Sequence, residues 1–247
     1  MNSIHSTCLL PSAASLPPFI LIHGAANSAL VWGYWQEELA AHGAAAFALD
    51  LRGHGKSVPY DLSQTGMHDY VDDVCALARQ LGQPPVLIGW SMGGLVAMMA
   101  AAKIPTVACI GLAPSTPAIQ LDASIDLRTG EFTSEDYGIT SSRPEDQTVM
   151  PDLNTQERVV ALASLCMESL RARDERKRGI VIASLPCPLL IVTGTKDEFW
   201  PKEAYADLVL PADHLSIVDA SHWGLVLNRQ KVTEIESNVV AWVKKQI

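Results

Sequence analysis

Ser91 is the residue of this sequence best placed to do chemistry, because it lies in the pentapeptide Gly89-Trp90-Ser91-Met92-Gly93. An apolar run precedes the pentapeptide and an Ala- and Met-rich stretch follows it. A serine on a sharp strand-to-helix turn is exposed at the start of the helix, and the glycines remove side chains that would clash there. The pattern predicts a nucleophile. A glycine-rich turn with an inert serine is the alternative, which the flanking strand and helix disfavour.

A base and an acid for this serine follow the last two apolar runs of the chain. A serine hydroxyl is a poor nucleophile until a base takes its proton, and the base needs an acid that orients it and stabilises its charge. His222 and Asp197 suit these roles, and their order after Ser91 is the expected one. Asp219, three residues before His222, competes weakly for the acid role. We therefore predict the triad Ser91, Asp197 and His222.

The predicted elements that position these residues are short apolar runs alternating with stretches of helix length. Strands are expected at residues 19–22, 44–49, 86–89, 107–112, 189–193 and 214–218. Helices are expected near residues 31–41, 69–81, 92–102, 202–210 and 232–245. This alternation is typical of the α/β class with a mostly parallel, doubly wound sheet.

Residues 114–185 interrupt this alternation, since they contain no convincing strand. The first half is polar and acidic, whereas residues 155–178 have apolar side chains at helical spacing. An insertion of about seventy residues is far longer than the usual connection of about 2 to 6. We expect one domain whose core is formed by residues 1–113 and 186–247, with 114–185 inserted as a helical cap. Residues 128–147, rich in Gly, Ser, Thr and Pro, are expected to be mobile.

The sequence resembles the α/β-hydrolase superfamily over nearly the whole chain outside the cap. Besides the pentapeptide, the resemblance rests on the His-Gly loop at 23–28, the Asp-Leu-Arg-Gly-His-Gly-Lys-Ser turn at 50–57, and the segments around Asp197 and His222. It implies the α/β-hydrolase fold and a serine esterase. Because only eighteen residues precede the strand at 19–22, the first edge of the sheet is expected to be shortened.

The resemblance also implies an oxyanion hole made of two backbone amides. One belongs to the residue after His-Gly, here Ala25, and the other to the residue after the nucleophile, here Met92. Such donors are already oriented toward the oxygen that becomes negative. Structural roles are favoured for His23 and for the 50–57 turn, in which Asp50 and Arg52 form hydrogen bonds.

Apolar and aromatic side chains near these motifs are expected to line the substrate pocket, together with the cap residues Leu162, Cys166 and Met167. The expected wall residues are Asn27, Trp32, Trp90, Phe199, Trp200, Trp223 and Leu225. A core position is the equal alternative for Trp32 and for these cap residues. Except for Lys196, no Lys or Arg lies beside a catalytic motif. We therefore expect a small, largely apolar and uncharged substrate.

Composition narrows the partners and the compartment. Acidic residues number 27 and basic residues 18, so the chain carries a formal charge of −9 and a nucleic-acid partner is not expected. The sequence shows neither a signal-peptide pattern nor an apolar run of bilayer length, so no membrane association is expected. Five dispersed cysteines without a CxxC pair argue against disulfides and zinc. We expect a cytoplasmic protein without metal or cofactor, and nothing specifies an oligomeric state.

Five basic residues lie within the run from Arg171 to Arg178. A solvated helix end is the favoured interpretation, because cations are stabilised at a helix C-terminus. Resemblance supplies the alternative. The string at 89–97 is similar to that of the biotin-pathway esterases that cleave pimeloyl methyl ester from its acyl carrier protein, and arginines of their cap hold the acidic carrier.

The sequence as a whole favours a serine hydrolase that cleaves a small carboxylic ester through an acyl-enzyme. A lactone or a thioester would suit the same chemistry. The first alternative is a cofactor-free tailoring enzyme, such as a lyase or cyclase, on the same fold and triad. A non-catalytic ligand-binding relative is the second, which an intact triad disfavours.

Overall fold

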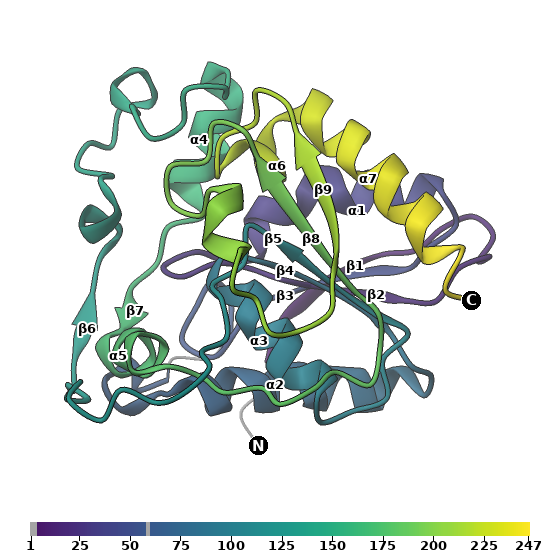
Figure 1. Cartoon of the computed structure of the whole chain (residues 1–247). Coiled ribbons are helices and arrows are strands. Elements are labelled where there is room, and N and C mark those ends of the chain that lie inside the picture. The colour runs from purple at the N-terminus through teal and green to yellow at the C-terminus, as the bar shows by residue number, and fades with distance from the viewer. Residues whose placement is uncertain (1–3, 58–59) are drawn as a thin grey trace.

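A seven-stranded sheet forms the centre of the computed structural model, which describes residues 4–57 and 60–247 (Figure 1). The strand order is β1-β3-β2-β4-β5-β8-β9, and only the pairing of β1 with β3 is antiparallel. The strands are β1 (Ser6–Leu9), β2 (Phe19–Ile22), β3 (Ala46–Leu49), β4 (Val86–Trp90), β5 (Ala108–Leu112), β8 (Leu189–Gly194) and β9 (Asp213–Ile217). The predicted mostly parallel, doubly wound sheet is confirmed.

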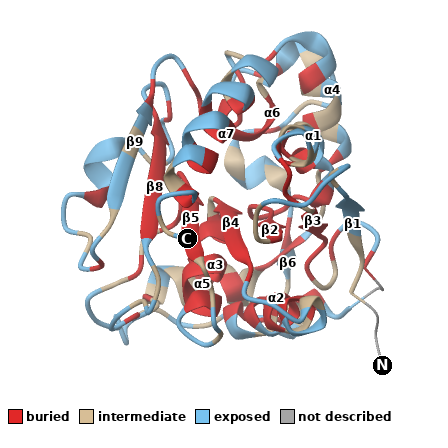
Figure 2. Cartoon of the chain, turned by 90° about the vertical axis from the view of Figure 1, so that its right-hand side faces the viewer, coloured by how far each residue is buried: buried red, intermediate tan, exposed pale blue. Residues whose placement is uncertain are grey.

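Helices cover both faces of the sheet, which explains why the central strands are apolar throughout. Every residue of β2, β4 and β5 is buried, and Figure 2 shows these strands in red. One face packs against α1 (Gly33–Ala41), α6 (Gly224–Leu227) and α7 (Arg229–Val243). The other packs against α2 (Met67–Leu81) and α3 (Met92–Ala101). Burial on both faces is typical of parallel sheets.

Two predicted helices differ from the observed elements. The stretch at 31–41 begins as a 3₁₀ turn, η1 (Ala29–Trp32), before α1 starts. The helix expected at 202–210 is wrong, because only a short 3₁₀ turn, η5 (Lys202–Tyr205), forms there. The buried side chains of residues 202–210, Tyr205 and Leu210, are five residues apart, and a helix would place them on different sides. The first edge of the sheet, which we expected to be short, is formed by the four-residue strand β1.

Residues 114–185, the segment that we expected to form a cap and call the cap below, contain more elements than the single helical stretch expected. Two short strands, β6 (Glu131–Phe132) and β7 (Glu168–Ser169), pair there as an antiparallel ribbon. The other elements are the helices α4 (Thr155–Ala163) and α5 (Leu170–Arg178) and the turns η3 (Ser134–Tyr137) and η4 (Pro144–Asp146). The predicted helical stretch is interrupted between α4 and α5, where two polar side chains are buried against the core. Ser164 Oγ donates to Asn27 at 2.8 Å, and Glu168 is fully buried.

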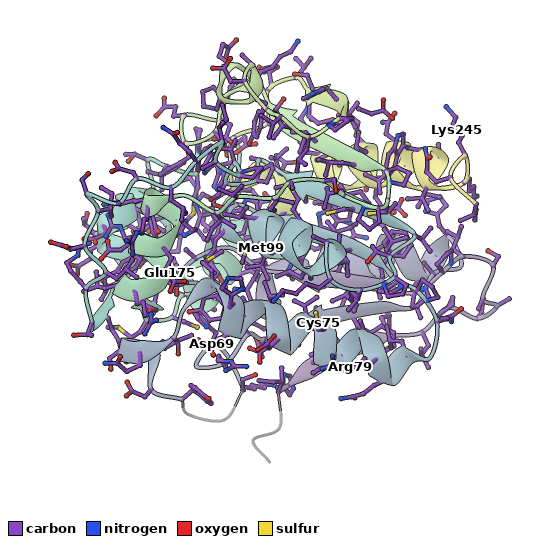
Figure 3. The ribbon with its side chains drawn as sticks, turned by 60° about the horizontal axis from the view of Figure 1, so that its bottom comes forward. Asp69, Cys75, Arg79, Met99, Glu175 and Lys245 are labelled. Atoms are coloured by element: carbon purple, nitrogen blue, oxygen red, sulfur yellow. The ribbon has the colours of Figure 1, made fainter. Side chains whose placement is uncertain are left out.

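The cap is fastened to the core at the start of α2. The Glu175 carboxylate, on α5, accepts a hydrogen bond of 2.7 Å from the amide of Met67. Asp69, in the first turn of α2, accepts from the amide of Gly66 at 2.8 Å. Figure 3 labels both Glu175 and Asp69 on their two elements. The η2 turn (Leu62–Gln64) leads into this corner. In the described part of the chain, no helix is both long and apolar enough to cross a membrane.

Candidate active site

Ser91 lies in the turn between β4 and α3, with φ of 55° and ψ of −120°. A positive φ is unfavourable for a residue with a Cβ, so the surrounding contacts must hold the turn in place. The amide of Ser91 donates to the carbonyl of Leu112 at 3.0 Å, and its carbonyl accepts from Ser115 at 2.9 Å. Backbone hydrogen bonds to the end of β5 therefore fix the strained serine at the carboxyl edge of the sheet.

The glycines of the pentapeptide allow the turn to pack closely. A Cβ on Gly89 would overlap the carbonyl of Gly93, and a Cβ on Gly93 would overlap the carbonyl of Ile22 at the end of β2. Both obstacles are backbone atoms, which cannot rotate away. The turn can thus form in this place only if neither position carries a side chain.

His222 and Asp197 meet across the carboxyl ends of β8 and β9. His222 Nδ1 lies 2.7 Å from Asp197 Oδ2, while Asp197 Oδ1 accepts from the amides of Phe199 and Trp200, each at 2.9 Å. Burial by itself would raise the pKa of Asp197, but the hydrogen bond and charge of His222 and the two amides lower it below its usual value. Asp197 is therefore held as a carboxylate facing Nδ1 of the ring.

The structure brings Asp197, and not Asp219, to the histidine. Asp219 is exposed over 63% of its side chain, and its carboxylate lies 3.0 Å from Lys196 Nζ. The ring of His222 is enclosed instead by aromatic side chains. Its centroid lies 5.0 Å from that of Trp90 and 5.1 Å from that of Phe199.

Ser91 and His222 line a single cavity of about 240 Å³. Its wall includes five of the seven side chains expected there: Asn27, Trp90, Phe199, Trp200 and Trp223. Gly24 and Ala25 of the His-Gly loop also line it, as do four cap residues that the sequence did not point to: Ser134, Tyr137, Ile139 and Arg176. The only sequence signal for these four was the basic run that contains Arg176.

The remaining expected wall residues lie elsewhere. Trp32 is fully buried in the core, with its ring centroid 6.0 Å from that of Trp35. Leu225 is also buried, and its carbonyl accepts from Trp35 Nε1 at 3.1 Å. Both side chains therefore belong to the core and not to the cavity wall. Of the cap residues expected in the pocket, Leu162 packs on the core, Cys166 lines a separate cavity, and Met167 is 41% exposed.

The His-Gly loop is held by its own hydrogen bonds and by the cap. Asn27 Nδ2 donates to the carbonyl of Ala25 at 2.8 Å, and the amide of Ala26 donates to Glu168 Oε2 at 3.1 Å. Within the described residues, none of the hydrogen bonds uses the amide of Ala25 or that of Met92. Both amides therefore remain available to a ligand atom.

His23 is fully buried and bonded on both ring nitrogens. Nδ1 lies 2.8 Å from the carbonyl of Gly24, and Nε2 accepts from the amide of Leu51 at 3.1 Å. Burial, followed by the charge of His54, lowers its pKa to about 4. A neutral His23 thus ties the His-Gly loop to the end of β3, as its favoured structural role requires.

A buried ion pair links the 50–57 turn to the cap. His54 Nε2 lies 3.4 Å from Glu168 Oε2, and Tyr70 donates to Glu168 Oε1 at 2.6 Å. Burial would raise the pKa of Glu168, but the charge and contact of His54, with Tyr70, lower it to about 2. Burial would lower the pKa of His54, but Glu168 raises it. Each group therefore favours the charged form of the other.

Asp50 and Arg52 stabilise the 50–57 turn with different partners. The Asp50 carboxylate accepts from the amides of Ala29 and Lys56, at 2.7 and 2.9 Å. Arg52 does not bond to Asp50 but reaches α2, where its Nη2 lies 2.6 Å from Asp73 Oδ1. The turn is therefore architectural, and its arginine connects it to a neighbouring helix.

Residues 19–234 match the family described as the alpha/beta hydrolase family. A pimeloyl-[acyl-carrier protein] methyl ester esterase from Xanthomonas oryzae pv. oryzae is 27% identical over 253 residues, which cover 92% of this chain and 96% of the relative. An esterase of the same description from Citrobacter koseri is 30% identical over 186 residues, covering 70% of this chain and 62% of the relative.

Solved structures of this fold are similar over nearly the whole chain. The monoacylglycerol lipase of Paleococcus ferrophilus aligns with a TM-score of 0.71 at 18% identity, covering 99% of this chain and 100% of the lipase. An esterase from Thermogutta terrifontis aligns with a TM-score of 0.69 at 20% identity, covering 97% and 93%. At these identities the likeness establishes the fold.

Proposed function

The chain belongs to the alpha/beta hydrolase family and is a carboxylic ester hydrolase, and we propose that it cleaves its ester by nucleophilic attack of Ser91. One observation supports this proposal most strongly. The 2.7 Å contact between His222 and Asp197 lies beside a cavity that Ser91 also lines, with Ser91 held at a positive φ. A serine, a base and an oriented acid converging on one cavity are what acyl transfer needs.

In the first half of the proposed reaction, Ser91 Oγ attacks the carbonyl carbon while His222 Nε2 takes the hydroxyl proton. Asp197 keeps the ring oriented by accepting from Nδ1 and stabilises the imidazolium. The carbonyl oxygen becomes negative and accepts from the amides of Ala25 and Met92. Each such donor contributes about 3 to 4 kcal/mol to the transition state. The C–O bond to the alcohol then breaks, and the alcohol leaves with the proton from His222.

In the second half, water attacks the acyl-enzyme and gives its proton to His222. The bond between the acyl carbon and Ser91 Oγ breaks, and the serine recovers the proton as the acid is released. A lactone or a thioester would pass through the same steps with a different leaving group. No step in this sequence requires a metal or a cofactor.

The proposed substrate is small, because the cavity of about 240 Å³ lies at the lower end of ligand pockets. Trp90, Trp200 and Trp223 make much of its wall apolar. We further propose that residues 114–185 act as a cap over the site, since Ser134, Tyr137, Ile139 and Arg176 form one side of the cavity.

An acyl carrier is not part of the proposed substrate, although the printed names of the Xanthomonas and Citrobacter relatives include one. Arg171 pairs with Glu175 at 3.1 Å, and Arg173 pairs with Asp136 while lying over the ring of Phe132. Two arginines of the basic run are thus already engaged within the cap.

All five cysteines lie in the described part of the chain as free thiols, which supports our proposal that the protein works in the reducing cytoplasm.

A panel of p-nitrophenyl esters of increasing acyl length tests the proposed function. The wild-type protein is expected to hydrolyse the short esters, and Ser91→Ala to lose this activity. Ser216→Ala, which changes an exposed serine of β9, is the matched control and should behave as wild type. Absence of hydrolysis by the wild type, or equal hydrolysis by Ser91→Ala, would contradict the proposal.

A further inference from the structure

One cation faces the reaction cavity, and it comes from the cap. Arg176 of α5 lines the cavity together with Ser91 and His222. None of the residues described along this wall is an Asp or a Glu, and none besides Arg176 is a Lys or an Arg. The sequence had predicted an uncharged substrate because no Lys or Arg except Lys196 lies beside a catalytic motif, and Arg176 lies 85 positions from Ser91 in the chain.

The guanidinium of Arg176 is not neutralised by the protein residues that the structure describes. Its Nη2 donates to the hydroxyl of Tyr137 at 3.3 Å, whereas its Nε is buried without a hydrogen-bond acceptor. No described carboxylate lies within 4.0 Å of it. Arg171 and Arg173, on the same helix, each have a carboxylate partner. Arg176 therefore differs from Arg171 and Arg173 in having donors left over. Arg178 Nε is likewise buried without an acceptor, but Arg178 does not line the cavity.

Arg176 lowers the pKa of Glu168, but the Glu168 carboxylate already has other hydrogen-bond partners. Burial raises the pKa of Glu168 and His54 lowers it most, while Arg176 adds a smaller lowering. The oxygens of Glu168 accept from Tyr70, Ser169 and Ala26, and His54 lies 3.4 Å away. Glu168 is therefore partnered by other groups and does not occupy the donors of Arg176.

A partly buried guanidinium with unused donors is unfavourable in the absence of an anion. Its planar fork matches carboxylate and phosphate oxygens, which bind through two parallel hydrogen bonds. Arg176 lies in the last turn of α5, where a cation is stabilised by the helix, but a helix end alone would leave the charged group in solvent. Here its Nε is buried and the residue borders the cavity.

We propose that Arg176, with the hydroxyl of Tyr137, binds an anionic group at the non-reacting end of the ester substrate. The substrate class is a small ester that carries a carboxylate or a phosphoryl group, held so that its carbonyl lies at Ser91. This inference rests on the proposed function, since it names the substrate of the same site. Because the cavity is only about 240 Å³, the anionic group and the ester must lie on one short molecule.

The test compares esters that differ only in charge. The carboxylate series comprises the monomethyl esters of succinate, glutarate and adipate, and the neutral series carries a carboxamide in place of the carboxylate. Methyl 3-phosphonopropionate is the phosphoryl arm. Wild type should prefer at least one anionic ester over its amide in kcat/KM, and Arg176→Gln should lower that ratio about 10- to 100-fold, mainly through KM. Arg171→Gln, whose side chain is 41% exposed, is the matched control and should keep the ratio within about 3-fold.

The arm with the larger ratio identifies the anion as carboxylate or phosphoryl. The inference would be overturned if the wild-type kcat/KM of every anionic ester were close to that of its neutral amide, or if Arg176→Gln showed the same preference as wild type. Hydrolysis of the neutral esters would still uphold the proposed function in either case. If no ester is hydrolysed, the proposed function fails and binding decides the inference alone. Glutarate and methylphosphonate would then be titrated against the tryptophan fluorescence of the cavity. Saturable binding that Arg176→Gln abolishes supports the anion site, and no binding to wild type overturns it.

Discussion

Glu168 of the cap and His54 of the core form a buried ion pair, with 3.4 Å between Oε2 and Nε2. The same Glu168 oxygen accepts from the amide of Ala26, the residue that follows the proposed oxyanion donor Ala25. Neither side chain is exposed. Glu168 therefore connects residues 114–185 both to the 50–57 turn and to the His-Gly loop.

The stability of the fold should depend on pH through this pair. Glu168 has a folded pKa of about 2, below its usual 4.5, so its stabilisation is present above about 4.5 and is lost as the pH falls toward 2. His54 has a raised pKa, so its stabilisation is present below about 6.5 and is lost as the pH rises through the folded value. Urea unfolding between pH 2 and 9 measures this dependence.

Glu168→Gln should lower the free energy of unfolding by about 3 kcal/mol near pH 5 to 6, because it leaves His54 buried without its partner. The difference from wild type should shrink toward both ends of the pH range. Glu234→Gln, at an exposed carboxylate of α7, should change stability by less than about 0.5 kcal/mol at every pH. A Glu168→Gln effect that is the same at pH 2.5 and pH 6 would refute the ion-pair account.

Removal of the nucleophile or the base should nearly abolish ester hydrolysis. Ser91→Ala and His222→Ala should each lower kcat by on the order of 10⁵ to 10⁶, since triad residues act as a unit and their effects do not add. The double variant should be no worse than either single one. Additive losses in the double variant would show that the two residues act in separate steps.

The acid of the triad should be identified by a pair of asparagine substitutions. Asp197→Asn should lower kcat by on the order of 10⁴, less than Ser91→Ala, because the amide no longer favours the productive tautomer of His222. Asp219→Asn should change kcat little, because Asp219 is bound to Lys196 at the surface. A larger loss in Asp219→Asn than in Asp197→Asn would reverse the assignment.

Two glycine-to-alanine substitutions should have opposite effects on stability. Gly93→Ala should destabilise the fold by about 2 kcal/mol or more, because its Cβ would overlap the carbonyl of Ile22. Gly33→Ala should stabilise it by up to about 1 kcal/mol, because a Cβ at this helical position meets nothing within 4 Å. Thermal unfolding measures both, and equal melting temperatures for the two variants would contradict the packing described at the turn.

The sheet could be predicted from the sequence because parallel strands buried on both faces leave continuous apolar runs. The positions of Ser91, Asp197 and His222 could be predicted as well, since each follows the carboxyl end of a strand within five residues and these ends meet at one edge of a parallel sheet. The break between α4 and α5 could not be predicted, because it depends on partners far away in the sequence. Ser164 bonds to Asn27, a residue 137 positions away.

The cap wall of the cavity was missed for a similar reason. Ser134, Tyr137 and Arg176 lie in short turns and at a helix end, where no periodic pattern shows which side chain faces Ser91. Trp32 and Leu225 were placed in the pocket because they follow or precede catalytic motifs in the sequence. Both are buried in the core instead, because closeness to a motif in the sequence does not fix the direction in which a side chain points.

Active-site labelling with a fluorophosphonate tests whether Ser91 is the nucleophile, because this reagent is attacked only by an activated serine. We expect one adduct per chain, mapped by peptide mass to Ser91, with ester hydrolysis lost in proportion to labelling. His222→Ala should label far more slowly, and Ser216→Ala should label as wild type does. Labelling elsewhere, or full ester turnover by protein that carries the adduct on Ser91, would contradict an acyl-enzyme on Ser91 and favour a reaction in which the serine is never acylated.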